Sequence, residues 1–184
     1  MSRCDKTIYI SGPKTEDQYD DPRMPFVYIN VTDIYSRLTE KTIKTLVYIY
    51  DHLMHEFDWC LLANDDTFII MENLRQFLAN KCPSEKKVYG KILKYFRNKD
   101  IYTNGDTTRG FLQGGSGQLV SREAIRLFGE AMKEDVNFCV LLMGEAEDQE
   151  MSNCLRKLDI YPGESRDELN RERFLMDPFE KFEI

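Results

Sequence analysis

Two adjacent carboxylates, Asp65 and Asp66, follow a short apolar run and could together do chemistry. At the end of a buried strand they repel each other and lose hydration unless a cation or hydrogen-bond donors compensate. Carboxylate oxygens suit Mg²⁺ or Mn²⁺, and such ions usually share their coordination sphere with substrate phosphates. The pair therefore indicates either a divalent metal site for a phosphorylated ligand or an ordinary solvated turn.

A glycine-rich run is the second candidate. Gly114, Gly115 and Gly117 fall within four consecutive positions. Such a cluster occurs where the chain needs left-handed geometry or where its backbone must approach another group closely. It is typical of a loop that lies against a ligand, and equally of a tight turn with no ligand.

The segments around these residues predict alternating strands and helices. Strands are expected at 7–10, 26–29, 59–63, 67–70 and 88–90, and helices at 38–57, at 71–81, after Ser121 and from Asp148 to Leu158. Ser121 and Asp148 are expected to cap the last two helices. Alternation of this kind favours an α/β fold with a mainly parallel sheet covered on both faces. The two aspartates would then lie at one edge of that sheet.

Length and composition limit the classes of protein to which the chain can belong. Its 184 residues, 42% of them hydrophobic, are enough for a single domain with its own core. A formal net charge of -7 argues against a nucleic-acid partner. No run approaches the roughly 20 apolar residues of a membrane-spanning helix. Five cysteines without close CxxC pairs leave open both a cytosolic protein and a secretory-pathway protein with disulfides.

The stretch around the aspartates, FDWCLLANDDTFII at 57–70, resembles the "DWFLKADDDTYVI" segment of a glycosyltransferase family. Further resemblances follow in the family's order: ENLR at 72–75 to "xNLR", VYGK at 88–91 to "IYFGR", GGSGQLVS at 114–121 to "GGAGYVLS", Glu147-Asp148 followed by Cys154 to "EDxxxxxxC", and GESRD at 163–167 to "GDSRD". These collinear matches run from about Arg3 to Phe179. The chain thus resembles the core 1 β1,3-galactosyltransferases and their Fringe-like relatives in glycosyltransferase family 31.

The resemblance implies a GT-A-like, Rossmann-like α/β domain over residues 1–184 that is incomplete at its C-terminus. Members of the family bind UDP-galactose with Mn²⁺ and transfer galactose, with inversion, to the 3-hydroxyl of GalNAc on Ser or Thr of a glycoprotein acceptor. The resemblance also implies the lumenal side of the Golgi membrane, with the anchor outside this chain. A second copy of the chain or a chaperone is the further partner to expect.

The same resemblance assigns roles to residues. Asp65 and Asp66 would hold the metal against the diphosphate, with Asp65 also contacting the donor. Asp148 would be the base that takes the proton of the acceptor hydroxyl, although an N-cap role alone remains the alternative. Glu147 would contact the donor and would orient or tune Asp148 from the next position.

Other residues receive supporting roles by the same resemblance. The three glycines would let backbone amides approach the donor. Lys41 and Lys91 would neutralise diphosphate charge, or else be ordinary surface lysines. Cys139 and Cys154 would form a disulfide that braces the loop with the base.

Two departures from the family pattern support a second hypothesis. The family's triple acid reads Asn64-Asp65-Asp66 here, so an uncharged amide replaces its first carboxylate. The family's C-terminal region, which supplies a histidine metal ligand, has no counterpart in this sequence. The same family includes a non-catalytic chaperone of the galactosyltransferase, which lacks the acidic motif. Retention of Asp65, Asp66 and Asp148 favours the enzyme.

Overall fold

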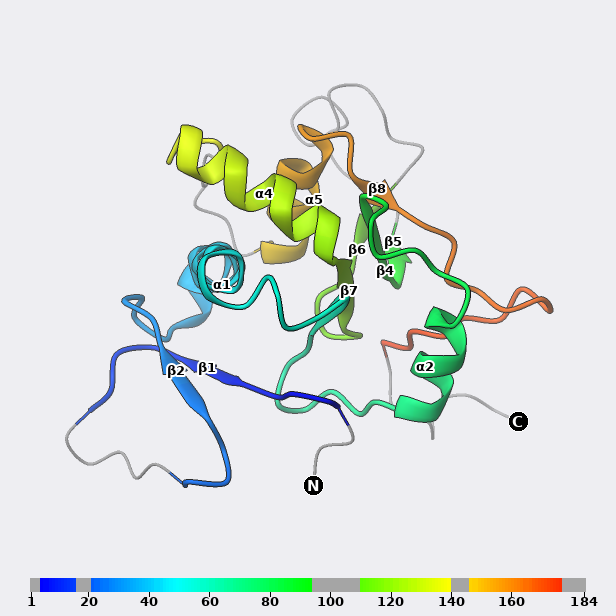
Figure 1. Cartoon of the computed structure of the whole chain (residues 1–184), viewed down its shortest axis with the longest axis horizontal. Coiled ribbons are helices and arrows are strands. Elements are labelled where there is room, and N and C mark those ends of the chain that lie inside the picture. Colours follow the sequence, from blue (N-terminus) through cyan, green and yellow to red (C-terminus); the bar gives the residue numbers. More distant parts are fainter. Residues whose placement is uncertain (1–3, 16–20, 94–109, 140–145, 177–184) are drawn as a thin grey trace.

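The computed structural model describes residues 4–15, 21–93, 110–139 and 146–176. Their elements appear in Figure 1 and follow in chain order: β1 (Tyr9–Ser11), β2 (Phe26–Tyr28), the 3-10 helix η1 (Tyr35–Arg37), α1 (Leu38–His52), β3 (Trp59–Leu62), α2 (Met71–Leu78), β4 (Lys87–Gly90), β5 (Ile92–Leu93), β6 (Phe111–Leu112), β7 (Gln118–Ser121), α4 (Arg122–Glu134), α5 (Glu147–Arg156) and β8 (Tyr161–Pro162). The expected α/β class is confirmed. The polar stretch 98–109, for which the sequence predicts a loop or hairpin tip, lies outside the described residues.

The largest sheet has four strands in the order β3-β7-β4-β8 and is mixed. β7 runs antiparallel to both β3 and β4, whereas β4 and β8 are parallel. The expectation of a mainly parallel sheet is therefore not confirmed. β3 and β4 do share a direction, as a strand-helix-strand unit predicts. The difference arises because β5 pairs antiparallel with β6, so the chain doubles back and inserts β7 between β3 and β4.

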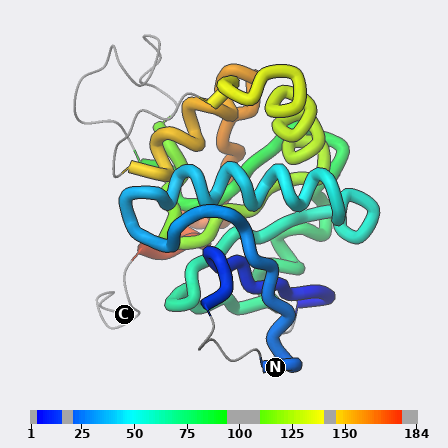
Figure 2. The backbone as a smooth tube through the Cα atoms, turned by 90° about the vertical axis from the view of Figure 1, so that its left-hand side faces the viewer, coloured from blue at the N-terminus to red at the C-terminus, as the bar shows by residue number. Residues whose placement is uncertain are grey.

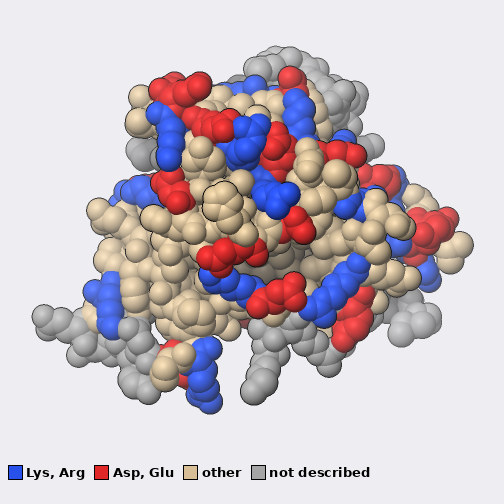
Figure 3. All heavy atoms as spheres, viewed as in Figure 1, with Lys and Arg blue, Asp and Glu red and all other residues tan. Residues whose placement is uncertain are grey.

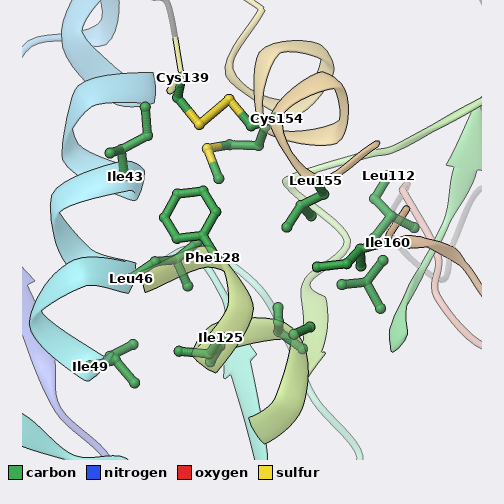
Figure 4. Close-up of a cluster of buried hydrophobic side chains, with 14 residues drawn as sticks. Ile43, Leu46, Ile49, Leu112, Ile125, Phe128, Cys139, Cys154, Leu155 and Ile160 are labelled. Carbon is green, nitrogen blue, oxygen red and sulfur yellow. A yellow bond between two sulfur atoms is a disulfide. The ribbon is translucent and has the colours of Figure 1, made fainter. Parts of the chain in front are cut away.

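Alternating side chains of this sheet enter two apolar layers. On one face, Val88 and Val120 pack with α1, α4 and α5 around Phe128, which is fully buried (Figure 4). On the other face, Tyr89 and Leu119 join Phe174 and side chains of α2. Neighbouring residues of β4 and β7 thus point to opposite faces, as the period of two in a strand requires. Helix side chains therefore pack against both faces of the sheet.

Helix α1 is central to the first layer. Figure 2 shows it crossing the molecule, with α4 and α5 on one side and the β1–β2 segment on the other. β1 and β2 pair in parallel as a separate two-stranded sheet. Within the described residues, no helix has both the length and the apolar character to cross a bilayer.

Two local predictions are wrong. Residues 67–70 form no strand: Phe68 is 83% exposed and Ile70 is 40% exposed, so this apolar run lacks the neighbours that would pair and bury it. The first long helix ends at His52 rather than near Phe57. The predicted cap at Ser121 is confirmed, since its side chain accepts a hydrogen bond from the backbone N–H of Ala124.

The contact between α1 and α4 gives a test of the packing. A methyl group added at Gly129 would lie 2.1 Å from Cγ of Tyr50. We expect Gly129→Ala to destabilise the protein by about 1–3 kcal/mol through overpacking, although in an open helix the same change gains roughly 1 kcal/mol. Urea unfolding measures the difference. Glu134→Ala, at the exposed end of α4, should stay within about 0.5 kcal/mol of the wild type, and equal stability of the two variants would contradict the packing.

Charged side chains of both signs are interspersed over the face shown in Figure 3. Many form local pairs, such as Arg126 with Glu123 and Glu130 along α4. Exposed pairs of this kind add little to stability.

Candidate active site

The acidic turn, residues 64–67, follows the C-terminal end of β3. Asp65 and Asp66 are exposed at its tip. Two bonds close the turn: the backbone N–H of Thr67 donates to the carbonyl of Asn64 at 3.2 Å, and the N–H of Asn64 donates to Oγ1 of Thr67 at 3.1 Å. The two carboxylates are thus held outward, where they can meet a cation.

The glycine bulge, residues 113–117, lies at the same edge. Gly90 pairs with Gln118, and Ile92 pairs with Leu112. Between these two pairs, the segment 113–117 from β6 to β7 lies opposite a single residue, Lys91, between β4 and β5. Such an insertion in an antiparallel pair is a bulge, which bends the strand and aims backbone groups away from the ladder. Gly117 has a φ of +86°, a left-handed conformation that favours glycine. The glycine run is therefore a built feature of the sheet edge.

Asp148 lies against this bulge. Its carboxylate accepts hydrogen bonds from the backbone N–H of Gln149, at 2.8 Å, and from that of Gly114. The expected N-cap role is wrong, because α5 begins at Glu147 and Ala146 occupies the cap position without a side-chain bond. Burial raises the pKa of Asp148, and the bonds from these N–H groups oppose that rise.

Glu147 connects α5 to α1. Its carboxyl group is buried and accepts a hydrogen bond from the side chain of Thr42. Burial raises the pKa of Glu147 to about 7, the Thr42 bond opposes this rise, and the charges of Asp148 and Glu150 add to it. A methyl group added at Gly114 would lie 3.1 Å from Oε2 of Glu147. Only a small residue at 114 lets the bulge approach both acids.

The raised pKa of Glu147 gives a second test. Because its folded pKa of about 7 exceeds the ordinary 4.5, the contribution of Glu147 to stability is greatest below pH 4.5 and is lost as the pH rises toward 7. Glu147→Gln removes this titration, so its stability relative to the wild type should grow by about 2–3 kcal/mol between pH 5 and pH 8. Urea unfolding at both pH values measures the change.

The matched control is Glu123→Gln. The side-chain bond from Arg126 lowers the pKa of Glu123, so its titration ends below the same pH window. That variant should keep a constant difference from the wild type between pH 5 and pH 8. A Glu147→Gln variant whose difference from the wild type is equally constant would contradict the burial of this carboxyl group.

The acidic turn and Asp148 meet at neighbouring glycines. The Thr67 hydroxyl donates to the carbonyl of Gly115 at 3.0 Å, while the N–H of Gly114 bonds to Asp148. The structure therefore brings the candidate metal ligands and the candidate base to one sheet edge. Sequence reasoning missed Thr67 and Thr42, since a hydroxyl residue carries no local signal for such distant partners.

Both candidate lysines already pair with carboxylates. Nζ of Lys41 lies 2.8 Å from each carboxylate oxygen of Asp33, and this bond lowers the pKa of Asp33. Nζ of Lys91 lies 2.7 Å from Glu172. Asp33 and Glu172 were not anticipated from the sequence. Donor binding by the two lysines stays a prediction, and it would require a phosphate to compete with these carboxylates.

The acidic turn suits an ion that is shared with a ligand. Among the residues that the structure describes, no group of three or more His, Cys, Asp or Glu side chains is placed to hold a metal. Mg²⁺, for example, is usually bound by one or two carboxylates plus water and substrate phosphates. Asp65 and Asp66 therefore fit a hard divalent cation whose coordination a diphosphate completes, rather than an all-protein metal site.

Cys139 and Cys154 form a disulfide, with their Cα atoms 5.4 Å apart, which confirms the expected pairing. The bridge ties α5, which carries Glu147 and Asp148, to the segment that follows α4.

A separate hollow of about 650 Å³ is lined by Lys86, Lys87, Tyr161 and neighbouring residues. It lies at the beginning of β4, away from the glycine bulge, so it is not part of this site.

Known proteins are similar in sequence to most of this chain. The galactosyltransferase family model matches residues 13–160. Glycoprotein-N-acetylgalactosamine 3-beta-galactosyltransferase 1 of Xenopus laevis is 29% identical over 171 residues, which are 93% of this chain and 42% of that protein. Chondroitin sulfate synthase 3 of Mus musculus and that of Homo sapiens are each 25% identical over 141 residues, which are 74% of this chain and 15% of those proteins. The chain thus spans less than half the length of these relatives.

Proposed function

The chain belongs to the galactosyltransferase family, and on this premise we propose that it transfers galactose from UDP-galactose to the 3-hydroxyl of GalNAc linked to Ser or Thr, with inversion. The arrangement around the glycine bulge carries this proposal. Asp148 contacts Gly114, and the turn with Asp65 and Asp66 is bonded to Gly115. Sugar transfer needs a group that binds the activated donor close to a base that takes the proton of the acceptor hydroxyl.

The acidic turn would hold the donor. Asp65 and Asp66 would bind Mn²⁺, which when present supplies positive charge to offset the negative charge that grows on the departing UDP. The exposed backbone at Gly115 leaves room for the diphosphate or the sugar to approach. Asn64 can contribute an amide oxygen but no charge. The turn therefore orients the leaving group rather than reacting with it.

Asp148 would act as the base. The acceptor oxygen forms a bond to C1 of galactose as the bond from C1 to the diphosphate breaks, and the hydroxyl proton passes to the Asp148 carboxylate. The two N–H bonds hold this carboxylate in place and leave further lone pairs to accept a proton. Because burial raises its pKa, the ionised group is a stronger base than a free aspartate.

A transfer assay tests the proposal. We expect the chain to convert UDP-galactose and a GalNAc-bearing peptide into the β1,3-linked disaccharide in Mn²⁺, and to lose this activity when EDTA removes the ion. UDP-GlcNAc is the comparison donor. Release of UDP without a disaccharide, or transfer that EDTA leaves unchanged, would contradict the proposed function.

A non-catalytic partner of a galactosyltransferase is the second candidate function. The uncharged Asn64 and the pairing of Lys41 and Lys91 with carboxylates favour it, because each reduces the positive charge or the metal ligands offered to a diphosphate. A chain of this kind would bind a galactosyltransferase yet produce no disaccharide. For either function we propose a Golgi lumenal setting, which the Cys139–Cys154 disulfide supports because such bonds persist in oxidising compartments.

A further inference from the structure

We infer that Thr67 is a positioning residue that clamps the acidic turn to the glycine bulge and so sets where a bound donor lies relative to Asp148. The inference rests on the proposed function and adds a residue to it. Thr67 itself contacts neither reacting group in this scheme. It acts through the backbone of Asn64 on one side and of Gly115 on the other.

The Thr67 hydroxyl makes two bonds of opposite sense. Oγ1 accepts from the backbone N–H of Asn64 at 3.1 Å and donates its proton to the carbonyl of Gly115 at 3.0 Å. A hydroxyl has one proton and two lone pairs, so both bonds form at once. The first closes the turn, and the second crosses to a segment 48 residues away in sequence.

The glycine bulge keeps its own shape without Thr67. The backbone N–H of Ser116 donates to Oε1 of Gln113 at 2.6 Å, and that of Gly117 donates to the carbonyl of Gly114 at 3.0 Å. The N–H of Gln113 also donates to the carbonyl of Lys91 at 2.9 Å. Loss of the Thr67 hydroxyl would therefore leave the bulge intact but let the acidic turn shift against it.

Such a shift matters because Gly114 and Gly115 are consecutive. Gly114 bonds to Asp148, and Gly115 bonds to the acidic turn through Thr67. The peptide unit between these two glycines therefore sets the position of the base relative to the bound donor. A misplacement of 1 Å between reacting groups can cost about 10²-fold in rate. The clamp should therefore affect turnover more than donor affinity, since Asp65 and Asp66 stay on the same turn.

The experiment compares Thr67→Val, which keeps the shape but removes the hydroxyl, with Thr67→Ser, which retains it. We expect Thr67→Val to lower kcat by about 10- to 100-fold, to change the affinity for UDP in Mn²⁺ by no more than about threefold, and to have no further effect on kcat in an Asp148→Asn background. Thr67→Ser should restore most of the rate. In the free protein, the backbone N–H of Asn64 should exchange its hydrogen with solvent faster in Thr67→Val than in Thr67→Ser.

Thr45→Val is the matched control, because the Thr45 hydroxyl also bonds to a backbone carbonyl, that of Lys41 at 2.7 Å within α1. Its kcat should stay near that of the wild type. Wild-type kcat in Thr67→Val, or an equal loss in Thr67→Ser, would overturn the inference. If the wild type transfers no galactose, the proposed function fails, while faster exchange at Asn64 in Thr67→Val alone would still support the clamp and unchanged exchange would overturn it.

Discussion

Replacement of Asp148 by asparagine should lower kcat for galactose transfer by about 10²- to 10⁴-fold, the range that a positioned general base contributes. The amide oxygen of asparagine can still accept the bond from the backbone N–H of Gln149, so this contact is retained while the basicity is lost. Affinity for UDP in Mn²⁺ should therefore change little. Steady-state kinetics and calorimetric titration measure the two quantities on the same preparation.

Asp135→Asn is the control for that substitution. Asp135 is exposed beyond the end of α4 and accepts a bond from the backbone N–H of Asn137, which asparagine can also accept. Its kcat should equal that of the wild type. If Asp148→Asn keeps full activity while Glu147→Gln loses it, the base is Glu147, and the role given to Asp148 is wrong.

Removal of the Asp66 side chain has the second large effect. We expect Asp66→Ala to lower kcat/KM by at least about 10³-fold, because a catalytic metal contributes several kcal/mol and each 1.36 kcal/mol is a factor of ten. Raising the Mn²⁺ concentration should recover little of the loss. Transfer rates measured across a range of Mn²⁺ concentrations give the result.

Asp58→Ala is the matched control, since Asp58 is an exposed aspartate just before β3, at the opposite end of that strand, where it pairs with Arg122 at 3.1 Å. It should leave the Mn²⁺ dependence unchanged. An Asp66→Ala variant that shows the wild-type Mn²⁺ dependence would place the metal on other ligands.

Local signals in the sequence predicted the helices α1, α2, α4 and α5 and the strands β1 to β4. The spacing of Ile43, Leu46 and Ile49 predicted α1, and all three are buried in the first apolar layer. Ser121 predicted the start of α4 because a capping hydroxyl acts within three residues. Such features depend on near neighbours, so a single sequence contains them.

Other features depend on partners far along the chain. The Thr67–Gly115 bond and the Thr42–Glu147 bond join segments that no local pattern relates. The antiparallel strand β7 was not anticipated, because alternation of strands and helices does not reveal that β5 and β6 double back. The strand expected at 67–70 failed for a similar reason: apolar β-formers such as Phe68 need a neighbouring strand, and the fold provides none among the described residues.

The central claim is that the acidic turn and Asp148 serve one metal-bound donor, and paramagnetic broadening by Mn²⁺ tests it most directly. With UDP and Mn²⁺ added to the isotopically labelled chain, we expect the amide signals of Asp66, Gly115 and Gln149 to broaden together. Those of Lys86 and Lys87, at the far end of β4, should remain sharp, and Mg²⁺ in place of Mn²⁺ should broaden none. Broadening that spares Gln149 while it affects Asp66, or that appears first at Lys86, would contradict a shared site.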